Sequence, residues 1–380
     1  MMMLMSLISY LDRNTLAVLA PTILHDTHLN NEQYGLIISA FSVAYMIGNP
    51  VWGILLDRIG LGRGMPAAVS IWTIASTAHA FVGGLPGFSV ARALLGFGEG
   101  ATFPGGLRTV AETLPPEKRS RGIAIAYSGG SLGAILAPLL VTPIGLRYGW
   151  RSAFLMTGLA GALWLSLWPL VARRGFRIAT DFSFRTMPKL WDRRFWGIVC
   201  SYGLGAFPLA FCLYIVPIYL SKVLGQSQST IGKLLWIPPL GWEVGYFAWG
   251  WIADRIAGPS ARHTGLMALL AVLSLPLLFV PFTHSVPYAM TEFFFAMFVG
   301  SGFLIMGLRY GMGVYDSNHA ALVAGIGAGS WSALVALIMP VIGRCFDLGL
   351  YARAFDLVTA IPILGFAGWW WFSRPVPAAE

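Results

Sequence analysis

Long apolar runs separated by short polar stretches occupy almost the whole chain of 380 residues. A run of about 20 apolar residues is long enough to cross about 30 Å of hydrocarbon as an α-helix. Strands of a membrane barrel would instead show alternating patterns of about ten residues, which these runs lack. The pattern predicts twelve membrane-spanning helices, at 1–24, 32–56, 64–83, 85–111, 120–143, 150–172, 195–219, 229–253, 263–283, 286–308, 319–344 and 351–372.

The composition agrees with a membrane protein. Hydrophobic residues make up 57% of the chain, charged residues make up 11%, and the mean hydropathy is +0.70. A soluble domain usually has about 25% charged residues, so this chain has too few to solvate its surface. The first span begins at residue 1, but the polar Tyr10, Asp12 and Arg13 would interrupt the apolar region of a signal peptide. We therefore expect a helix here, with a basic cytoplasmic segment before it.

The positive charges indicate the orientation in the membrane. If the N-terminus is cytoplasmic, sixteen basic residues lie in inner connections: Arg58, Arg63, Lys118, Arg119, Arg121, Arg173, Arg174, Arg177, Arg185, Lys189, Arg193, Arg194, Arg255, Arg262, Arg309 and Arg374. The outer connections hold six: Arg147, Arg151, Lys222, Lys233, Arg344 and Arg353. This bias predicts that both termini lie in the cytoplasm. We expect the protein to lie in the cell (inner) membrane. The net charge of +9 then sets orientation and implies no nucleic-acid partner.

The longest polar stretch, 173–194, divides the chain into two halves of six spans. The halves contain similar segments. Gly53-Ile-Leu-Leu-Asp57-Arg58-Ile-Gly60 ends the second span, and Gly250-Trp-Ile-Ala-Asp254-Arg255-Ile-Ala-Gly258 ends the eighth. Repeated helical units are common in secondary transporters, which hold their substrate near the membrane midplane. We expect bundles at 1–172 and 195–380, joined by a cytoplasmic linker at 173–194.

Three motifs resemble those of the major facilitator superfamily. They are the Gly53–Gly60 segment followed by Arg63, the sequence Arg92-Ala-Leu-Leu-Gly96-Phe-Gly98, and Gly149-Trp150-Arg151-Ser-Ala-Phe154. The resemblance covers nearly the whole chain and is densest in residues 10–154. It implies two pseudo-symmetric six-helix bundles and a transport function.

Within that superfamily the chain resembles the anion:cation symporter family, whose best-known bacterial members carry hexuronates and galactonate. The resemblance rests on Tyr10-Leu-Asp12-Arg13-Asn-Thr-Leu, on Gly98-Glu99-Gly-Ala-Thr-Phe-Pro104 and on Pro115-Pro116-Glu117-Lys-Arg119-Ser. It implies that Asp12 and Glu99 carry protons. It also implies that four side chains contact the substrate: Tyr10, Arg13, Tyr45 and Arg92.

The charged residues within the spans predict a functional site independently, because a charge at membrane depth costs about 2.5–3.5 kcal/mol on insertion scales. Tyr10 and Arg13 share one face of their helix, whereas Asp12 points about 100° away towards a neighbouring helix. Arg92 and Glu99 share one face of the fourth span. The arginines can hold a substrate carboxylate in a bidentate manner. The alternative is that these charges only neutralise one another as ion pairs between helices.

Further candidates line the same expected cavity. Asn49 lies four residues after Tyr45 on one helix face, and the alternative for Tyr45 is aromatic packing. Ser128 begins a glycine-rich stretch that lacks the Gly-Pro dipeptide of drug antiporters; we expect its glycines to let helices pack closely. Tyr214 and Trp331 offer hydroxyl and stacking contacts for a polyol, with a packing role as the alternative. Glu243 is a lone carboxyl of the eighth span, eleven residues or about 16 Å from Asp254 at the cytoplasmic end, so we expect it to be buried. It is either a second proton site or a structural hydrogen-bonding group.

Charged residues at the cytoplasmic ends of spans two and eight predict a gate. We expect the set to hold the inner side closed and to release it as the bundles rock: Asp57, Arg58, Arg63, Asp254 and Arg255. The alternative, charge that only sets topology, fits the arginines but not the aspartates.

The sequence thus predicts a monomeric importer that carries a small organic anion, such as a sugar acid, together with protons. An exchanger or uniporter of the same fold is the alternative within transport. A membrane enzyme would need a catalytic constellation near an interface, and none is present in the sequence. No cofactor or metal is expected, since the sequence shows no His/Asp ligand cluster and the three cysteines form no paired motif.

Overall fold

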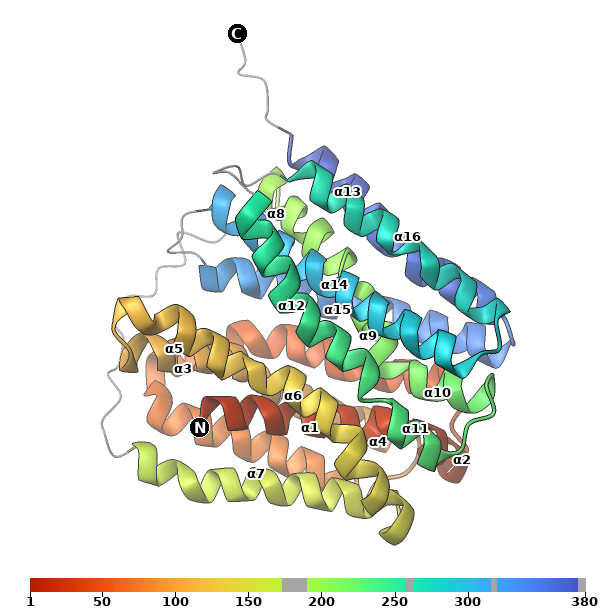
Figure 1. The fold of residues 1–380 in the computed structure, drawn as a ribbon. Helices are drawn as coiled ribbons and strands as arrows, with labels where there is room; N and C mark the ends of the chain where they lie inside the picture. The colour runs from red at the N-terminus through yellow and green to blue at the C-terminus, as the bar shows by residue number, and fades with distance from the viewer. Residues whose placement is uncertain (173–189, 257–262, 316–319, 375–380) are drawn as a thin grey trace. The chain divides into compact units, whose positions relative to one another are not determined.

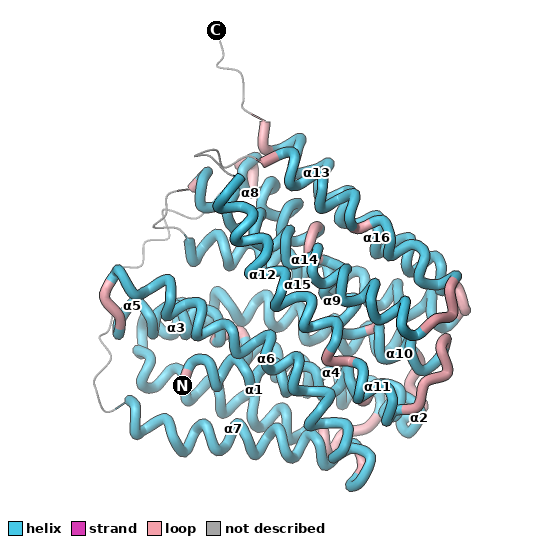
Figure 2. Tube along the Cα trace, in the orientation of Figure 1, coloured by secondary structure: helices cyan, strands magenta, loops and turns pink. Residues whose placement is uncertain are grey.

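A computed structural model describes residues 1–172, 190–256, 263–315 and 320–374. Every regular element in these ranges is a helix, and none of them contains a strand (Figure 2). The predicted all-α fold is therefore confirmed for this part of the chain. Residues 173–189 of the predicted linker lie outside the described residues, and so do Gly258 and Arg262.

The chain forms two compact units. The first comprises Met1–Ser183, Leu213–Leu240 and Val335–Leu350, and the second comprises Phe184–Cys212, Gly241–Leu334 and Tyr351–Glu380. The first unit thus contains the bundle predicted at 1–172 together with two segments that the sequence had placed in the second half.

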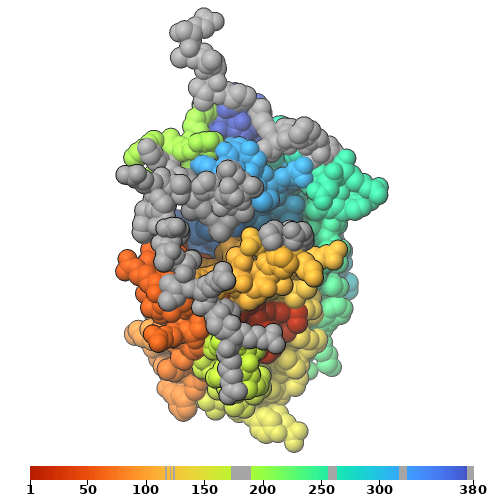
Figure 3. Space-filling view, turned by 90° about the vertical axis from the view of Figure 1, so that its left-hand side faces the viewer, coloured from red at the N-terminus to blue at the C-terminus, as the bar shows by residue number. Residues whose placement is uncertain are grey.

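The first unit is built mainly from the N-terminal helices: α1 (Met2–Val18), α2 (Ala20–Thr27), α3 (Asn31–Ala78), α4 (Gly84–Glu99), α5 (Thr102–Thr113), α6 (Pro116–Tyr148) and α7 (Trp150–Ala172). The later segments add α10 (Val216–Lys222) and α11 (Gln228–Leu234). Helix α1 packs against α6 and α7, while α3 packs against α4, α5 and α7 (Figure 1). The end of this unit where α3 kinks and α6 begins faces the viewer in Figure 3, with α3 in orange and α5 in gold.

Breaks in these helices divide several of the predicted spans. The two predicted spans 32–56 and 64–83 lie on either side of Gly60, a non-helical residue of α3 with φ 75° and ψ 163°, and the second extends beyond the end of α3 at Ala78. A positive φ is easily adopted by glycine because it lacks a Cβ atom, so the chain can kink there. The predicted spans 1–24 and 85–111 are each divided into two helices, α1 and α2 or α4 and α5.

The second unit contains the remaining helices: α8 (Arg193–Ile198), the π-helical turn Val199–Leu204, α9 (Phe207–Tyr214), α12 (Ile237–Ile256), α13 (Thr264–Leu273), the 3₁₀ segment Leu275–Phe282, α14 (Val286–Val314), α15 (Ala320–Asp347) and α16 (Tyr351–Phe372). The ends of α9, α12 and α15 extend into the first unit. The second unit has an apolar core of its own around Trp249, Phe303 and Trp369.

Eight helices in the described ranges are long and apolar enough to cross a membrane: Asn31–Ala78, Ile125–Tyr148, Trp150–Ala172, Arg193–Tyr214, Thr264–Phe282, Val286–Val314, Val323–Asp347 and Tyr351–Phe372. Large apolar side chains are also exposed on them, such as Ile74 at 68%, Leu159 at 70% and Leu337 at 71%. Lipid can cover such side chains, whereas water would penalise them.

Polar contacts attach the two later segments of the first unit to the end of α1 and the start of α3. Asn30 and Gln33 cap this helix reciprocally through their side chains. Asp347, at the end of α15, accepts hydrogen bonds from the backbone N–H groups of Asn31 (3.0 Å) and Glu32 (2.8 Å). A carboxylate is stabilised at a helix N-terminus, where unpaired N–H groups carry partial positive charge. The side chain of Gln228 donates to the carbonyl oxygen of Val18 at 2.8 Å.

Candidate functional site

A buried arginine from α1 lies at the centre of the candidate site. Arg13 is 3% exposed, and its guanidinium carbon lies 4.6 Å from the ring centroid of Tyr10, 4.7 Å from that of Phe41 and 4.8 Å from that of Tyr45. Aromatic faces attract cations, most strongly where water is excluded. Tyr10 and Arg13 therefore share a face of α1, as their spacing predicts.

Arg13 forms an ion pair with Glu99, the last residue of α4. Nε and Nη2 of Arg13 donate to Oε2 of Glu99 at 3.2 and 2.8 Å. Both side chains are buried, so the pair is shielded from solvent. A charge buried at this depth is stable only while its partner remains in place, because removing one partner leaves an uncompensated charge.

Arg92 lies on the same helix as Glu99, and fewer hydrogen bonds compensate for the burial of its charge. It is 0% exposed, and its Nη2 donates to the backbone carbonyl oxygen of Arg13 at 3.1 Å. Among the described residues, its Nε and Nη1 atoms have no hydrogen-bond partner. A buried guanidinium with unused donors is costly, and an anion that enters the site would satisfy them.

Asp12 points away from Arg13, as predicted, and reaches α3. Its Oδ1 accepts a hydrogen bond from the hydroxyl of Ser76 at 2.6 Å, and Ser76 lies 2.9 Å from the hydroxyl of Thr157 in α7. Asp12 is 1% exposed and forms no ion pair among the described residues. Of the four charged side chains in this cluster, Arg13 and Glu99 form an ion pair with each other, whereas Asp12 and Arg92 form none in the described part of the chain.

Glycines bring α4 close enough to α3 for this arrangement. A Cβ atom on Gly96 would overlap the carbonyl oxygen of Phe41, and one on Gly48 would lie 2.7 Å from that of Phe97. The glycine in the Arg92–Gly98 motif therefore allows the two backbones to approach. The glycines after Ser128 act similarly between α6 and α1, where a Cβ atom on Gly133 would lie 2.5 Å from the carbonyl oxygen of Leu7. Their predicted packing role is confirmed.

The other predicted binding residues lie in different surroundings. The carbonyl oxygen of Tyr214 accepts from the Tyr34 hydroxyl at 3.0 Å, and both side chains are buried near Arg92. Asn49 donates to the carbonyl oxygen of Tyr45 in its own helix at 3.0 Å. Ser128 likewise donates within its helix, to Ile125 at 3.0 Å, and makes no hydrogen bond to the charged cluster among the described residues.

Trp331 and Glu243 belong to the second unit. The indole N–H of Trp331 donates to the carbonyl oxygen of Ala206 at 3.1 Å. Glu243 is partly exposed, so the expectation of a fully buried carboxyl is wrong. Its distance from the end of the helix suggested burial, but depth along a helix does not determine which way the side chain faces.

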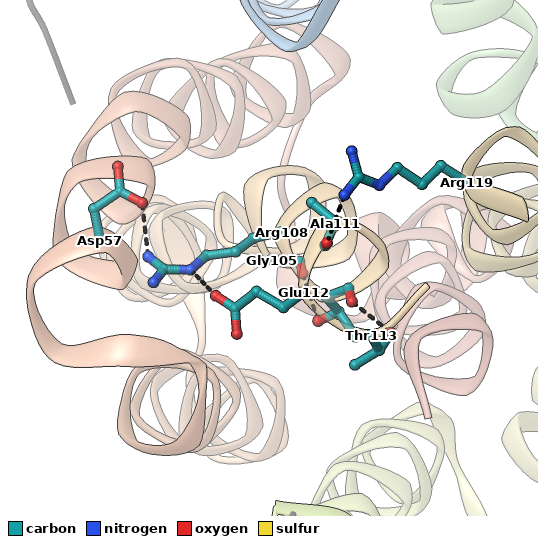
Figure 4. Close-up of polar contacts among 8 residues, drawn as sticks. Asp57, Gly105, Arg108, Ala111, Glu112, Thr113 and Arg119 are labelled. Carbon is teal, nitrogen blue, oxygen red and sulfur yellow. Dashed lines mark hydrogen bonds and ion pairs between the residues drawn. The ribbon is translucent and has the colours of Figure 1, made fainter. Parts of the chain in front are cut away.

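Asp57, one of the predicted gate residues, pairs within its own unit (Figure 4). Its Oδ1 accepts from Nη1 of Arg108 at 2.6 Å, and Nε of Arg108 donates to Glu112 at 2.5 Å. The arginine thus bridges α3 and α5. Arg58 and Arg63 are exposed and form no ion pair among the described residues.

The corresponding segment of the second unit is more loosely paired. Asp254 accepts from Nη1 of Arg309 in α14 at 3.2 Å, and the Asp254 side chain is 81% exposed. Arg255 makes no ion pair among the described residues, and its guanidinium lies 4.0 Å from the ring centroid of Trp251. The two repeated segments therefore share an aspartate–arginine contact but differ in burial.

Sequence reasoning did not identify several residues of these clusters: Tyr34, Phe41, Ser76, Arg108, Glu112, Thr157 and Asp347. Small hydroxyl residues and aromatics are common in membrane helices, so most of this set gives no signal. Arg108 and Glu112 are four residues apart, the spacing of an ion pair on a helix, and this spacing could have indicated them.

Comparison with known proteins identifies the family. A family model described as Major Facilitator Superfamily matches residues 2–340. The chain belongs to the Major Facilitator Superfamily. It is 27% identical to the hexuronate transporter of Escherichia coli K12 over 407 aligned residues, which cover 99% of this chain and 93% of the relative. It is also 27% identical to the galacturonate transporter of Dickeya chrysanthemi, over 65% of this chain and 78% of the relative.

Solved structures share the fold of this Major Facilitator Superfamily chain. One, a bacterial homologue of the human lysosomal transporter Spinster in an inward-facing and occupied conformation, has a TM-score of 0.83 and 16% sequence identity. That match covers 99% of this chain and 97% of the other. Another, the peptide transporter POT in complex with sulfate, has a TM-score of 0.79 at 16% identity, covering 97% and 92%. The predicted major facilitator fold is confirmed, and the chain is a multi-pass membrane transporter and not an enzyme.

Proposed function

We propose that the chain imports a small organic anion, such as a hexuronate or a related sugar acid, in symport with protons. One observation carries the proposal. Arg92 is fully buried with two donor atoms unused among the described residues, and it lies beside a closed Arg13–Glu99 ion pair. A substrate carboxylate would accept hydrogen bonds from these unused donors of Arg92. The hexuronate and galacturonate transporters named above support this class of substrate.

The two arginines would bind the carboxylate, because a guanidinium offers two parallel donors to its oxygens. Arg92 has donors for this purpose in the present arrangement, whereas Arg13 would have to leave Glu99 first. The rings of Tyr10 and Tyr45, which now face Arg13, would then be able to pack against the apolar face of a sugar ring. Asn49, Ser128 and Trp331 remain candidates for the hydroxyl groups of the substrate.

Glu99 would couple this binding to a proton. A protonated Glu99 no longer carries the charge that holds Arg13, so the arginine becomes available to the substrate. After the substrate leaves, loss of the proton restores the ion pair. Asp12 would provide a second proton site, because its carboxylate is buried without an ion pair among the described residues. Glu243 remains a less buried candidate in the second unit.

Alternating access would depend on contacts at the two ends of the first unit. In the proposed orientation, both termini lie on the cytoplasmic side of the inner membrane. Asp57 and Arg108 then lie at the cytoplasmic end of the first unit, and the start of α3 lies at its outer end. The bonds from Tyr34 to Tyr214 and from the α3 N-terminus to Asp347 would hold the outer side closed. The Asp57–Arg108 and Asp254–Arg309 pairs would act at the inner gate, with Arg58, Arg63 and Arg255 as exposed partners.

Uptake by the purified protein in proteoliposomes tests the proposal. An inward proton gradient alone should drive accumulation of glucuronate or galacturonate, and a protonophore should abolish it. A thermal-shift screen of sugar acids at two pH values would select the substrate first. Uptake that needs internal substrate and ignores the proton gradient would instead establish an exchanger, and uptake without accumulation would establish a uniporter.

A further inference from the structure

The buried carboxylate of Asp12 is held by a hydroxyl from another helix. The Ser76 hydroxyl in α3 donates to Oδ1 of Asp12 at 2.6 Å, and both residues are 1% exposed. Among the described residues, Oδ2 of Asp12 has no hydrogen-bond partner. An ionised carboxylate can accept about four hydrogen bonds, so Ser76 provides much of what the ionised form receives here.

A second hydroxyl extends this contact into α7. Thr157 is 0% exposed, and its Oγ1 lies 2.9 Å from the Ser76 oxygen and 3.2 Å from the carbonyl oxygen of Phe154, which can accept from it. Three helices therefore contribute to one chain of hydrogen bonds, from Asp12 through two hydroxyls to a backbone carbonyl oxygen. Because a hydroxyl both donates and accepts, each link of this chain can run in either direction.

The direction of the chain depends on the state of Asp12. When Asp12 is ionised, Ser76 donates to it and Thr157 is free to donate to Ser76. When Asp12 is a neutral acid, its O–H can donate to Ser76, which donates to Thr157, which donates to the carbonyl oxygen of Phe154. Rotation of two hydroxyl groups thus keeps the hydrogen bond between Ser76 and Oδ1 of Asp12 in both states without movement of a heavy atom, and a buried polar group is costly when it loses its partner.

Close packing fixes the distance between the two hydroxyls. A Cβ atom on Gly158 of α7 would overlap the hydroxyl of Thr77, and one on Gly161 would overlap that of Thr73. These glycines let α7 lie directly on α3, where small residues allow membrane helices to approach closely. The contact between Ser76 and Thr157 is therefore part of a tightly packed helix interface.

Charged groups near Asp12 come from α4 and from α1 itself. Glu99 and Arg92 of α4 are close enough to influence it electrostatically, and Arg13 follows it in α1. His79 lies one turn after Ser76. Its Nδ1 forms a hydrogen bond with the carbonyl oxygen of Ala75 at 2.7 Å, and its ring stacks on that of Phe154. The described residue of α7 that contacts this chain of hydrogen bonds is the neutral Thr157.

We propose that Ser76 and Thr157 are positioning residues that form a hydroxyl relay and keep a hydrogen bond at Oδ1 of Asp12 in both its protonated and its ionised state. The inference rests on the proposed function, in which Asp12 carries a proton. The relay lets this buried carboxyl gain and lose that proton while its hydrogen bond to Ser76 is kept. Its loss should therefore affect the release of protons more than the binding of substrate.

The test compares proton-driven accumulation with exchange of internal for external substrate in proteoliposomes, across a series of internal pH values. Ser76→Ala removes the donor to the ionised form, so that form becomes less favourable and proton release needs a more alkaline interior. We expect accumulation at neutral internal pH to fall about tenfold, the effect of one hydrogen bond to a charged group. The internal pH of half-maximal accumulation should rise by about one unit, while exchange falls less than twofold.

Two further variants separate the relay from a folding defect. Thr157→Val keeps the shape of the side chain and should reduce accumulation about threefold, with rescue by Thr157→Ser, as expected for one neutral hydrogen bond. Ser42→Ala is the matched control, because Ser42 is a buried serine of α3 that donates to Ile38 of its own helix. It should behave as the wild type does.

Three results would overturn the relay. The first is a wild-type pH profile in both Ser76→Ala and Thr157→Val, and the second is an equal loss of exchange and accumulation in both. The third concerns Asp12→Asn. Wild-type accumulation by that variant would remove Asp12 from the proposed function itself and the relay with it. Loss of accumulation in Asp12→Asn with no effect of the hydroxyl variants would refute the relay alone.

Discussion

The two units of this transporter differ in the kind of polar group they bury. The first unit buries Asp12, Arg13, Arg92 and Glu99, all at 3% exposure or less. Among the described residues of the second unit, no buried side chain is charged, and its buried serines and threonines are Ser201, Ser274, Ser301, Ser332 and Thr359. Charge at membrane depth is costly and is kept where it has a role. The difference supports the proposal that the first unit provides the groups that bind the anion and the protons.

The repeated segments at the ends of α3 and α12 show the same difference on a smaller scale. Arg108 is 10% exposed and bridges Asp57 and Glu112, whereas the pair of Asp254 and Arg309 includes an aspartate that is 81% exposed. Solvent screens an exposed pair, so its contribution is small, typically about 0.2–1 kcal/mol. Two segments with similar sequences need not contribute equally to gating.

The largest predicted effect is that of replacing the unpaired arginine. Arg92→Gln should reduce hexuronate transport by about 100-fold or more, because a buried charge–charge contact to the substrate is lost. Arg92→Lys retains the positive charge but not the planar pair of donors, and should reduce transport by about tenfold. Initial rates of uptake and substrate-induced thermal shifts measure both effects.

The control for these variants is Arg309→Gln in the second unit, which removes a cation from a mostly exposed pair and should change uptake by less than about threefold. Wild-type binding by both Arg92→Gln and Arg13→Gln would remove the arginines from the substrate site. Equal losses in Arg92→Gln and Arg309→Gln would contradict the proposed difference between the units.

A smaller effect is expected at the gate. Asp57→Asn breaks the contact with Arg108 and should slow transport by about threefold to tenfold, while substrate binding changes little. Asp254→Asn alters an exposed pair and should slow transport by less than about twofold. Transport rates, with labelling of cysteines introduced at the cytoplasmic ends of the helices, compare the two.

Asp57→Asn should increase this labelling, because a weakened inner gate favours the inward-open state. If Asp254→Asn slowed transport as much as Asp57→Asn did, the solvent exposure of the two ion pairs would not determine their contributions to gating. Unchanged transport and labelling in Asp57→Asn would show that the Asp57–Arg108 contact is not part of a gate.

The sequence predicted the fold and most of the charged residues because both depend on local composition. Hydrophobic runs identify helices, and a charge within a run is visible directly. The pairing could not be predicted, since it depends on contacts between distant parts of the chain. Arg13 binds Glu99 because the fold brings α1 and α4 together, although the two residues are 86 positions apart in the sequence.

Residues without an unusual chemical signature were missed for the same reason. Ser76 and Thr157 acquire a role only when α7 packs on α3 beside Asp12. Asp347 ends α15, far from Asn31 in sequence, and only the folded chain brings its carboxylate to the start of α3. Glu243 illustrates the opposite error, because its position in a helix suggested burial but its side chain is partly exposed.

The coupling between Glu99 and Arg13 can be tested most directly by comparing accumulation with exchange in Glu99→Gln. Glutamine resembles the protonated acid, so the variant should bind the hexuronate and exchange it across the membrane. It should fail to accumulate it under an inward proton gradient, because no proton is released to restore the pair with Arg13. Accumulation equal to that of the wild type would contradict this coupling, and would leave Asp12 and Glu243 as the remaining candidates to carry the proton.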